Sequence, residues 1–172
     1  MKPYVRGKNI ALREVTLNDA AFLVRIRTDP ELGKHLSPTA ANVEAQEKYI
    51  ANYLTSQTDF YFVIADYQQN ALGSIRIYDI KGASFCWGSW ILLKEAPATA
   101  AIESALLIYD FGFFSLHYEK SHFDVRKTNT KVVSFHTRFG ARIVREDDLN
   151  YYFEFDRHAY LQTRERYDRY LP

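Results

Sequence analysis

Apolar and polar positions alternate over the middle of the chain. Residues 60–65 are aromatic and β-branched, and residues 72–80 place apolar and polar side chains on opposite faces, which is the period of a half-buried strand. Turn-forming residues at 68–70 and 81–82 divide this run. The pattern predicts three antiparallel strands, at 60–65, 72–80 and 84–93.

Helical spacing occurs before and after these strands. The longest such segment is apolar at positions 101, 102, 105, 108, 109, 112, 113 and 116. Helices are predicted at 17–27, 42–54, 98–116, 130–139 and 157–170, and further strands at 9–15, 121–125, 141–144 and 150–155. This order predicts an α/β fold in which helices flank both faces of a mixed sheet. The length of 172 residues fits one domain, residues 1–172.

Capping residues support two of these helices. Thr16, with Asp19 three residues later, can satisfy the first free amides of a helix. Asn129 can cap the helix at 130–139, and Gly140 is well placed to end it.

Charge and cysteine content exclude several classes of protein. Lys and Arg total 22 and Asp and Glu 21, a net charge of +1, whereas a nucleic-acid binder usually shows a basic excess. The single cysteine, Cys86, excludes an internal disulfide and a cysteine-rich zinc site. The N-terminus has no apolar signal core, and no apolar run approaches the ~20 residues that span a bilayer. We therefore expect a cytoplasmic protein, in keeping with a free thiol.

Common catalytic motifs are missing. The chain has no GxGxxG, GxxxxGK[ST] or GxSxG, and its five histidines form no metal-ligand pattern. We expect no bound metal. Cys86 lies in the middle of a predicted strand, so we interpret it as a buried small hydrophobe rather than a nucleophile.

A strand followed by a short loop and a long helix is the first segment with chemical content. Residues 88–93 lead into the loop at 94–101, which opens the long helix and is rich in small residues. A helix start offers free amides to an anion such as a pyrophosphate. An ordinary strand-to-helix turn fits the spacing equally well.

The second such segment lies between Asn129 and Gly140. Asn129 and His136 are seven residues apart, so two helical turns place them on one side. The order of both segments resembles the GNAT superfamily of acetyl-CoA-dependent N-acetyltransferases, and most closely its protein-N-terminal and amino-sugar branch. Leu12–Arg13 followed by Asp19 is similar to that branch too. The resemblance covers residues 9–170 and implies a GNAT-like central mixed sheet.

The resemblance assigns the cofactor to particular residues. The family loop Gln/Arg-x-x-Gly-x-Gly/Ala falls on residues 96–101, where only the last small residue matches. Pro97 removes one amide donor, and the Thr99 hydroxyl could replace it. The resemblance implies that acetyl-CoA contacts Ile91, Leu92, Leu93, Ala98, Thr99, Ala100, Ala101 and Asn129.

His136 falls where the family commonly has a tyrosine that protonates the departing thiolate. A histidine with an ordinary pKa near 6.5 could supply that proton at neutral pH. The alternative is a structural histidine at the edge of the core, beside Val132, Phe135 and Phe139.

The acceptor implied by the resemblance is a primary amine that attacks the thioester directly. We expect its pocket between the loop at 29–38 and the strands, with His35, Arg76, Tyr78 and Trp87 as substrate-binding residues. Aromatic faces suit sugar rings and Arg76 could pair with a phosphate, which favours a nucleotide-linked amino sugar over a protein N-terminus. The alternative places Trp87 and Tyr78 in the core and Arg76 in a surface ion pair. The general base stays open among His35, Glu31, Asp79 and a water.

Two other functions compete with this interpretation. The departures in the loop at 96–101 fit a non-catalytic module that binds acyl-CoA or regulates another protein. RNA binding is disfavoured by the near-zero net charge. The expected partners are a small-molecule or peptide amine, with no nucleic acid and no membrane, and a homodimer is left open.

Overall fold

One eight-stranded sheet organises the chain in the computed structural model, which describes residues 2–172. The strands are β1 (Tyr4–Arg6), β2 (Ile10–Glu14), β3 (Phe60–Asp66), β4 (Ala71–Lys81), β5 (Ser84–Leu92), β6 (Lys120–Arg126), β7 (Arg142–Glu146) and β8 (Asn150–Asp156). Their order across the sheet is β1-β2-β3-β4-β5-β6-β8-β7. The predicted meander from β3 to β5 and the mixed sheet are confirmed.

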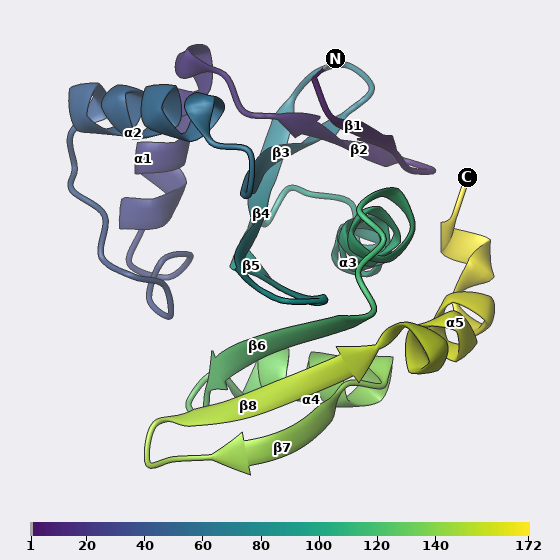
Figure 1. Cartoon of the computed structure of the whole chain (residues 1–172). Helices are drawn as coiled ribbons and strands as arrows, with labels where there is room; N and C mark the ends of the chain where they lie inside the picture. The colour runs from purple at the N-terminus through teal and green to yellow at the C-terminus, as the bar shows by residue number, and fades with distance from the viewer. Residues whose placement is uncertain (1) are drawn as a thin grey trace.

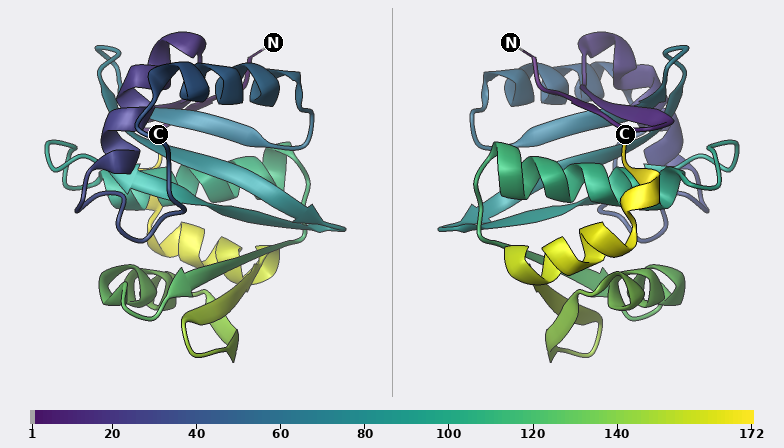
Figure 2. Two further views of the ribbon diagram at one scale, coloured as in Figure 1. Left: turned by 90° about the vertical axis from the view of Figure 1, so that its left-hand side faces the viewer. Right: turned by 90° about the vertical axis from the view of Figure 1, so that its right-hand side faces the viewer.

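Helices lie on both sides of this sheet (Figures 1 and 2). They are α1 (Ala20–Thr28), α2 (Val43–Thr55), α3 (Ala100–Asp110), α4 (Thr130–Phe139) and α5 (Arg157–Arg166), with single turns at Leu17–Asp19, Phe111–Ser115 and Asp168–Tyr170. Figure 1 shows α1 and α2 on one side of β2–β5 and α3 on the other, with α4 and α5 beside β6 and β8. The α/β class expected from the sequence is confirmed.

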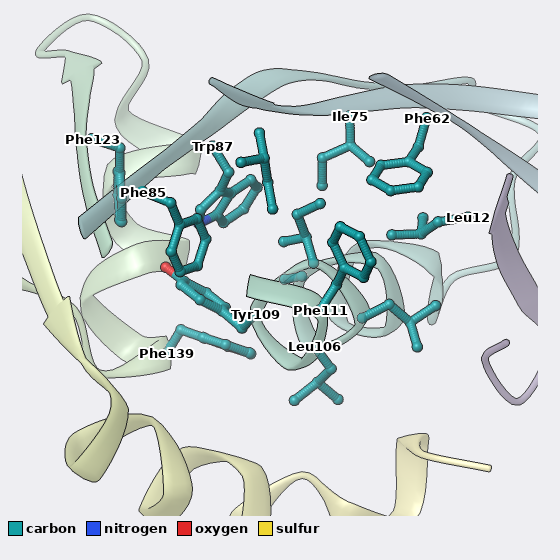
Figure 3. Close-up of a cluster of buried hydrophobic side chains, with 14 of the residues drawn as sticks. Leu12, Phe62, Ile75, Phe85, Trp87, Leu106, Tyr109, Phe111, Phe123 and Phe139 are labelled. Carbon is teal, nitrogen blue, oxygen red and sulfur yellow. The ribbon is translucent and has the colours of Figure 1, made fainter. Parts of the chain in front are cut away.

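Two hydrophobic clusters fill the space between the sheet and its helices. Tyr61 and Val63 of β3 pack with Leu23 of α1 and Ile50 of α2. On the other face, side chains of β2–β5, such as Ile75 and Phe85, pack with Tyr109 of α3 (Figure 3). Neighbouring residues of a strand point to opposite faces, so β3–β5 are apolar on both faces, as a sheet covered on both sides requires.

The strands β5 and β6 pair over a very short length. They are the one parallel pair among the described strands, joined only at Ser84↔Lys120 and Phe85↔Ser121. Beyond these residues they diverge (Figure 1), and β6 pairs along its whole length with β8 instead. The split opens the sheet in its middle.

Some elements differ from the sequence prediction. β1 was not expected, and it pairs with β2. The long helix ends at Asp110 and continues as a π-helical turn, where a Cβ on Gly112 would lie 2.3 Å from the Phe85 ring. Only glycine lets this turn approach the ring so closely, so the turn packs directly against Phe85 of β5.

Candidate active site

A cavity of about 510 Å³ opens where β5 and β6 diverge. Its walls are the loop at 34–38, Gly88–Trp90 of β5, residues 123–126 of β6 and the first turns of α4. Four segments far apart in the sequence therefore meet at the split in the sheet. Clefts of this size that hold a few polar groups are typical sites for small ligands.

A β-bulge shapes the β5 wall of this cavity. Ser74 pairs with Ile91 and Arg76 with Gly88, so Ile75 alone faces the two residues Ser89 and Trp90. Ser89 has a φ of +49°, a left-handed conformation that costs energy for a residue with a side chain. A bulge leaves backbone groups outside the ladder, so β5 can offer an amide to a ligand here.

Asn129 reaches the cavity from the start of α4. It occupies the N-cap position, but its side chain makes no capping hydrogen bond. Its backbone oxygen accepts from Val133 N at 3.0 Å, and Gly140, with a φ of +116°, ends the helix. The predicted helix bounds are confirmed, whereas the expected cap by the Asn129 side chain is wrong. That carboxamide is left for another partner on the cavity wall.

His136 lies in the cavity wall and inside the aromatic core at once. It is 4% exposed. The centre of its ring lies 4.4 Å from the ring centre of Phe123 and 5.3 Å from that of Trp87. Burial lowers the pKa of His136 to about 3, and its Nδ1 has no hydrogen-bond partner. The expectation of an ordinary pKa near 6.5 is therefore wrong, and the ring is a neutral imidazole at neutral pH.

Three of the expected substrate residues also line this cavity: His35, Tyr78 and Trp87. Trp87 pairs with Ile77, so Tyr78 and Trp87 come from opposite faces of the sheet, and the cavity reaches both. A Cβ on Gly88 would lie 2.7 Å from the Tyr78 hydroxyl. Trp87 is 3% exposed, and it serves as core and as cavity wall.

Arg76 belongs to a different cavity, of about 340 Å³. The candidate bases Glu31 and Asp79 also lie outside the cavity at the split. Asp79 instead pairs with Lys81 at 3.0 Å and with His122 at 3.3 Å. Of the proposed bases that are side chains, only His35 faces the cavity. Its pKa is lowered by burial and by the charges of Lys34 and Arg126, which keeps the imidazole free to accept a proton.

Sequence reasoning missed Asp124 and Asn150. Asp124 contributes a carboxylate to the wall of this cavity, and the Oδ1 atom of Asn150 is buried there without a partner. Aspartate is depleted in strands, so a carboxylate in the middle of β6 was a signal that could have marked this position.

The expected cofactor residues of β5 and the loop after it do not line the cavity. Ile91 is buried against the cluster under α1 and α2, and the Ala100 amide donates to Pro97 O at 2.8 Å. The Thr99 hydroxyl donates to Glu103 Oε1 at 3.0 Å, so it is already paired within the chain. No backbone acceptor among the described residues takes the amides of Ala98, Thr99, Ala101 or Ile102.

Cys86 fits its structural interpretation. It is 4% exposed in β5, and burial raises the pKa of its thiol to about 12. We expect Cys86→Ala to keep kcat close to that of the wild type, because a buried, protonated thiol is a poor nucleophile. Steady-state kinetics and mass spectrometry check this. An inactive but folded variant, or an acetyl group on Cys86, would contradict it.

Within residues 2–172, no three or more His, Cys, Asp or Glu side chains are grouped as a metal site would need. The described helices are all too short or too polar to cross a membrane.

Comparison with known proteins supplies the family. The sequence model of the acetyltransferase (GNAT) domain matches residues 9–142. The structure of apo FdhC, a nucleotide-linked sugar GNAT, is 37% identical, with a TM-score of 0.91 and 100% of both chains covered. No curated protein sequence matches the chain.

More distant structures share the fold alone. Spermidine N-acetyltransferase from Vibrio cholerae, in complex with CoA and spermine, is 16% identical, with a TM-score of 0.79 over 89% of this chain and 98% of that one. A GNAT-family acetyltransferase from Bacillus anthracis is 13% identical, with a TM-score of 0.77 over 90% and 98%. The family uses acetyl-CoA. The chain therefore belongs to the GNAT family of acetyltransferases, which confirms the family and the enzyme class that its motifs implied.

Proposed function

We propose that the chain transfers the acetyl group of acetyl-CoA to the amino group of a nucleotide-linked amino sugar, and that residues 1–172 act as one domain. The observation that carries this proposal is the cavity at the split between β5 and β6, with a bulge on one wall and Asn129 and His136 on the other. The full-length similarity to a nucleotide-linked sugar GNAT supports the acceptor class.

The cofactor fits a continuous path along β5. Gly88–Trp90 line the cavity, and Ile91, Leu92 and Leu93 continue the chain toward the start of α3. The free amides at Ala98, Thr99 and Ala101 face no backbone acceptor and suit a pyrophosphate. Ala100 belongs to this path through its small size rather than through its amide. The Asn129 carboxamide is a polar partner beside the cavity. Acetyl-CoA bound along this path would supply an activated acyl carbonyl.

Proton transfer falls to the side chains around the cavity. The acceptor ammonium must lose a proton before its nitrogen can attack. His35, whose pKa is lowered, and the carboxylate of Asp124 can each accept that proton from the cavity wall. We assign stabilisation of the developing oxyanion to a backbone amide of the β5 bulge. His136, as a neutral imidazole, donates a hydrogen bond to the departing sulfur rather than acting as an imidazolium.

An acceptor panel tests the proposal. The chain is incubated with acetyl-CoA and either a nucleotide-linked amino sugar, spermidine or a short peptide, and thiol release and product mass are measured. We expect thiol release and one added acetyl group with the amino sugar alone. A melting-temperature rise with acetyl-CoA, worth ~2.7 kcal/mol at 100 times its Kd, but no transfer to any amine would favour the non-catalytic module.

The proposed cellular location rests on the cysteine. We propose a cytoplasmic enzyme, because the free, buried thiol of Cys86 suits a reducing compartment. The homodimer stays a prediction, which light scattering of the purified chain tests.

A further inference from the structure

A second cavity, of about 340 Å³, lies between α1, α2 and the strands β3 and β4. Two arginines line it, Arg27 from α1 and Arg76 from β4, and no carboxylate does. Hydroxyl and amide side chains from Thr39, Gln46 and Tyr49 complete the wall. The lining is thus cationic and rich in hydrogen-bond donors.

Arg76 is held by aromatic rings more than by a carboxylate. Its guanidinium carbon lies 4.9 Å from the ring centre of Tyr61, 5.4 Å from that of Tyr49 and 5.3 Å from that of Tyr78. The carboxylate of Asp59 is 3.8 Å away, beyond hydrogen-bond distance. The side chain is 16% exposed, and its Nε is buried without a partner.

Arg27 is also incompletely paired. Its Nε donates to Thr39 Oγ1 at 2.7 Å, and its Nη2 donates to Ser37 O at 3.4 Å. Its Nη1 is buried without a partner, and no ion pair to it occurs in the described part of the chain. Arg13, by contrast, forms two hydrogen bonds to Asp19 at 2.8 and 2.9 Å.

Two incompletely paired guanidinium groups make this cavity suited to an anion. A buried donor without a partner costs free energy, and a guanidinium is well matched to the oxygens of a phosphate. Two such groups on one cavity, with no carboxylate in its lining, can hold a group with two negative charges.

This cavity adjoins the cavity at the split in the sheet. Ser37 and Pro38 line both, and Arg76 is two residues from Tyr78 on the same face of β4. A ligand can therefore place its anionic part beside Arg27 and Arg76 and its other end near His35.

The geometry points to Arg27 and Arg76 as the subsite that binds the diphosphate of the acceptor nucleotide. The inference rests on the proposed function for the position of the amine, because the sugar must then extend past Tyr78 into the first cavity. It assigns the phosphates of CoA to a different place, the helix start at 98–102.

Binding of a nucleoside diphosphate without its sugar tests this subsite independently of catalysis. Calorimetry compares the diphosphate with the uncharged nucleoside on the wild type, Arg27→Gln, Arg76→Gln and the control Arg25→Gln, an exposed arginine of the same helix. We expect each cavity variant to weaken diphosphate binding by ~10- to 100-fold, as for lost charge-assisted hydrogen bonds, and the control to leave it unchanged. The Kd of CoA should not change in any variant.

Lysine variants cover the case in which glutamine disturbs the fold. Arg27→Lys and Arg76→Lys keep the charge but lose the planar fork, so we expect a smaller but measurable loss of diphosphate affinity. Wild-type affinity in folded variants, equal binding of nucleoside and diphosphate, or a loss of CoA affinity instead would each overturn the subsite. Arginine-dependent diphosphate binding without acetyl transfer would uphold the subsite and contradict the proposed function.

Discussion

Replacement of His136 by phenylalanine is expected to lower kcat about 100-fold, as for the loss of one positioned donor in an active site. The phenyl ring keeps the volume and the aromatic contacts of the imidazole but cannot donate to the departing sulfur. The affinity for acetyl-CoA should hardly change, because the missing hydrogen bond matters mainly in the transition state. Steady-state kcat and the Kd of acetyl-CoA are the measurements.

The fold should survive this change. His136 is surrounded by the rings of Trp87, Phe123, Phe135 and Phe153, and phenylalanine removes the buried Nδ1 that lacks a partner. A melting temperature at or above that of the wild type is therefore expected. His136→Tyr should recover part of the rate, since its hydroxyl is a donor. A folded His136→Phe variant with wild-type kcat would remove His136 from the mechanism and leave it a core residue.

The same histidine should make stability depend on pH. Its pKa is about 3 in the folded chain and near 6.5 when unfolded. Between these values the unfolded state binds one more proton, so stability falls as the pH falls. From pH 7 to pH 5 the contribution of His136 to the free energy of unfolding should drop by about 2 kcal/mol.

Urea unfolding at both pH values measures this drop, with His136→Phe as the matched control. Other groups, including the paired Asp19, titrate in both proteins, so the difference between the two pH dependences isolates His136. Equal pH dependence in wild type and variant would show that the imidazole is not kept neutral by burial.

Helices and strands were predicted well, because their caps, turns and apolar spacing depend on residues that are close in the sequence. Thr16 and Asp19 form the expected capping box, and Gly140 ends α4 through its left-handed backbone. The alternation of β4 and the apolar spacing of α3 also matched the fold. Each of these features depends on residues within one or two turns of chain.

Features that depend on packing against distant segments could not be predicted from the local sequence pattern. On α2 the apolar residues Val43 and Leu54 are exposed, whereas Gln46, Ile50 and Tyr53 are buried. Helix packing, rather than hydrophobicity alone, decides that face. The local sequence pattern also did not predict that Glu103 would accept a hydrogen bond from the Thr99 hydroxyl.

The site was only partly predictable for the same reason. His35, Tyr78, Trp87, Asn129 and His136, which the sequence analysis assigned to separate roles, line one cavity. Arg76 lies in the neighbouring cavity. The pKa of His136 depends on aromatic residues from several elements of the fold, which no local pattern reveals.

A crystal structure with bound CoA tests the central claim most directly. The account predicts the pantetheine arm between the diverging ends of β5 and β6, the sulfur beside His136, and the pyrophosphate at the amides of residues 98–102. CoA bound elsewhere on the molecule, or a sulfur remote from the β5 bulge and His136, would contradict the assignment of this cavity as the site of acetyl transfer.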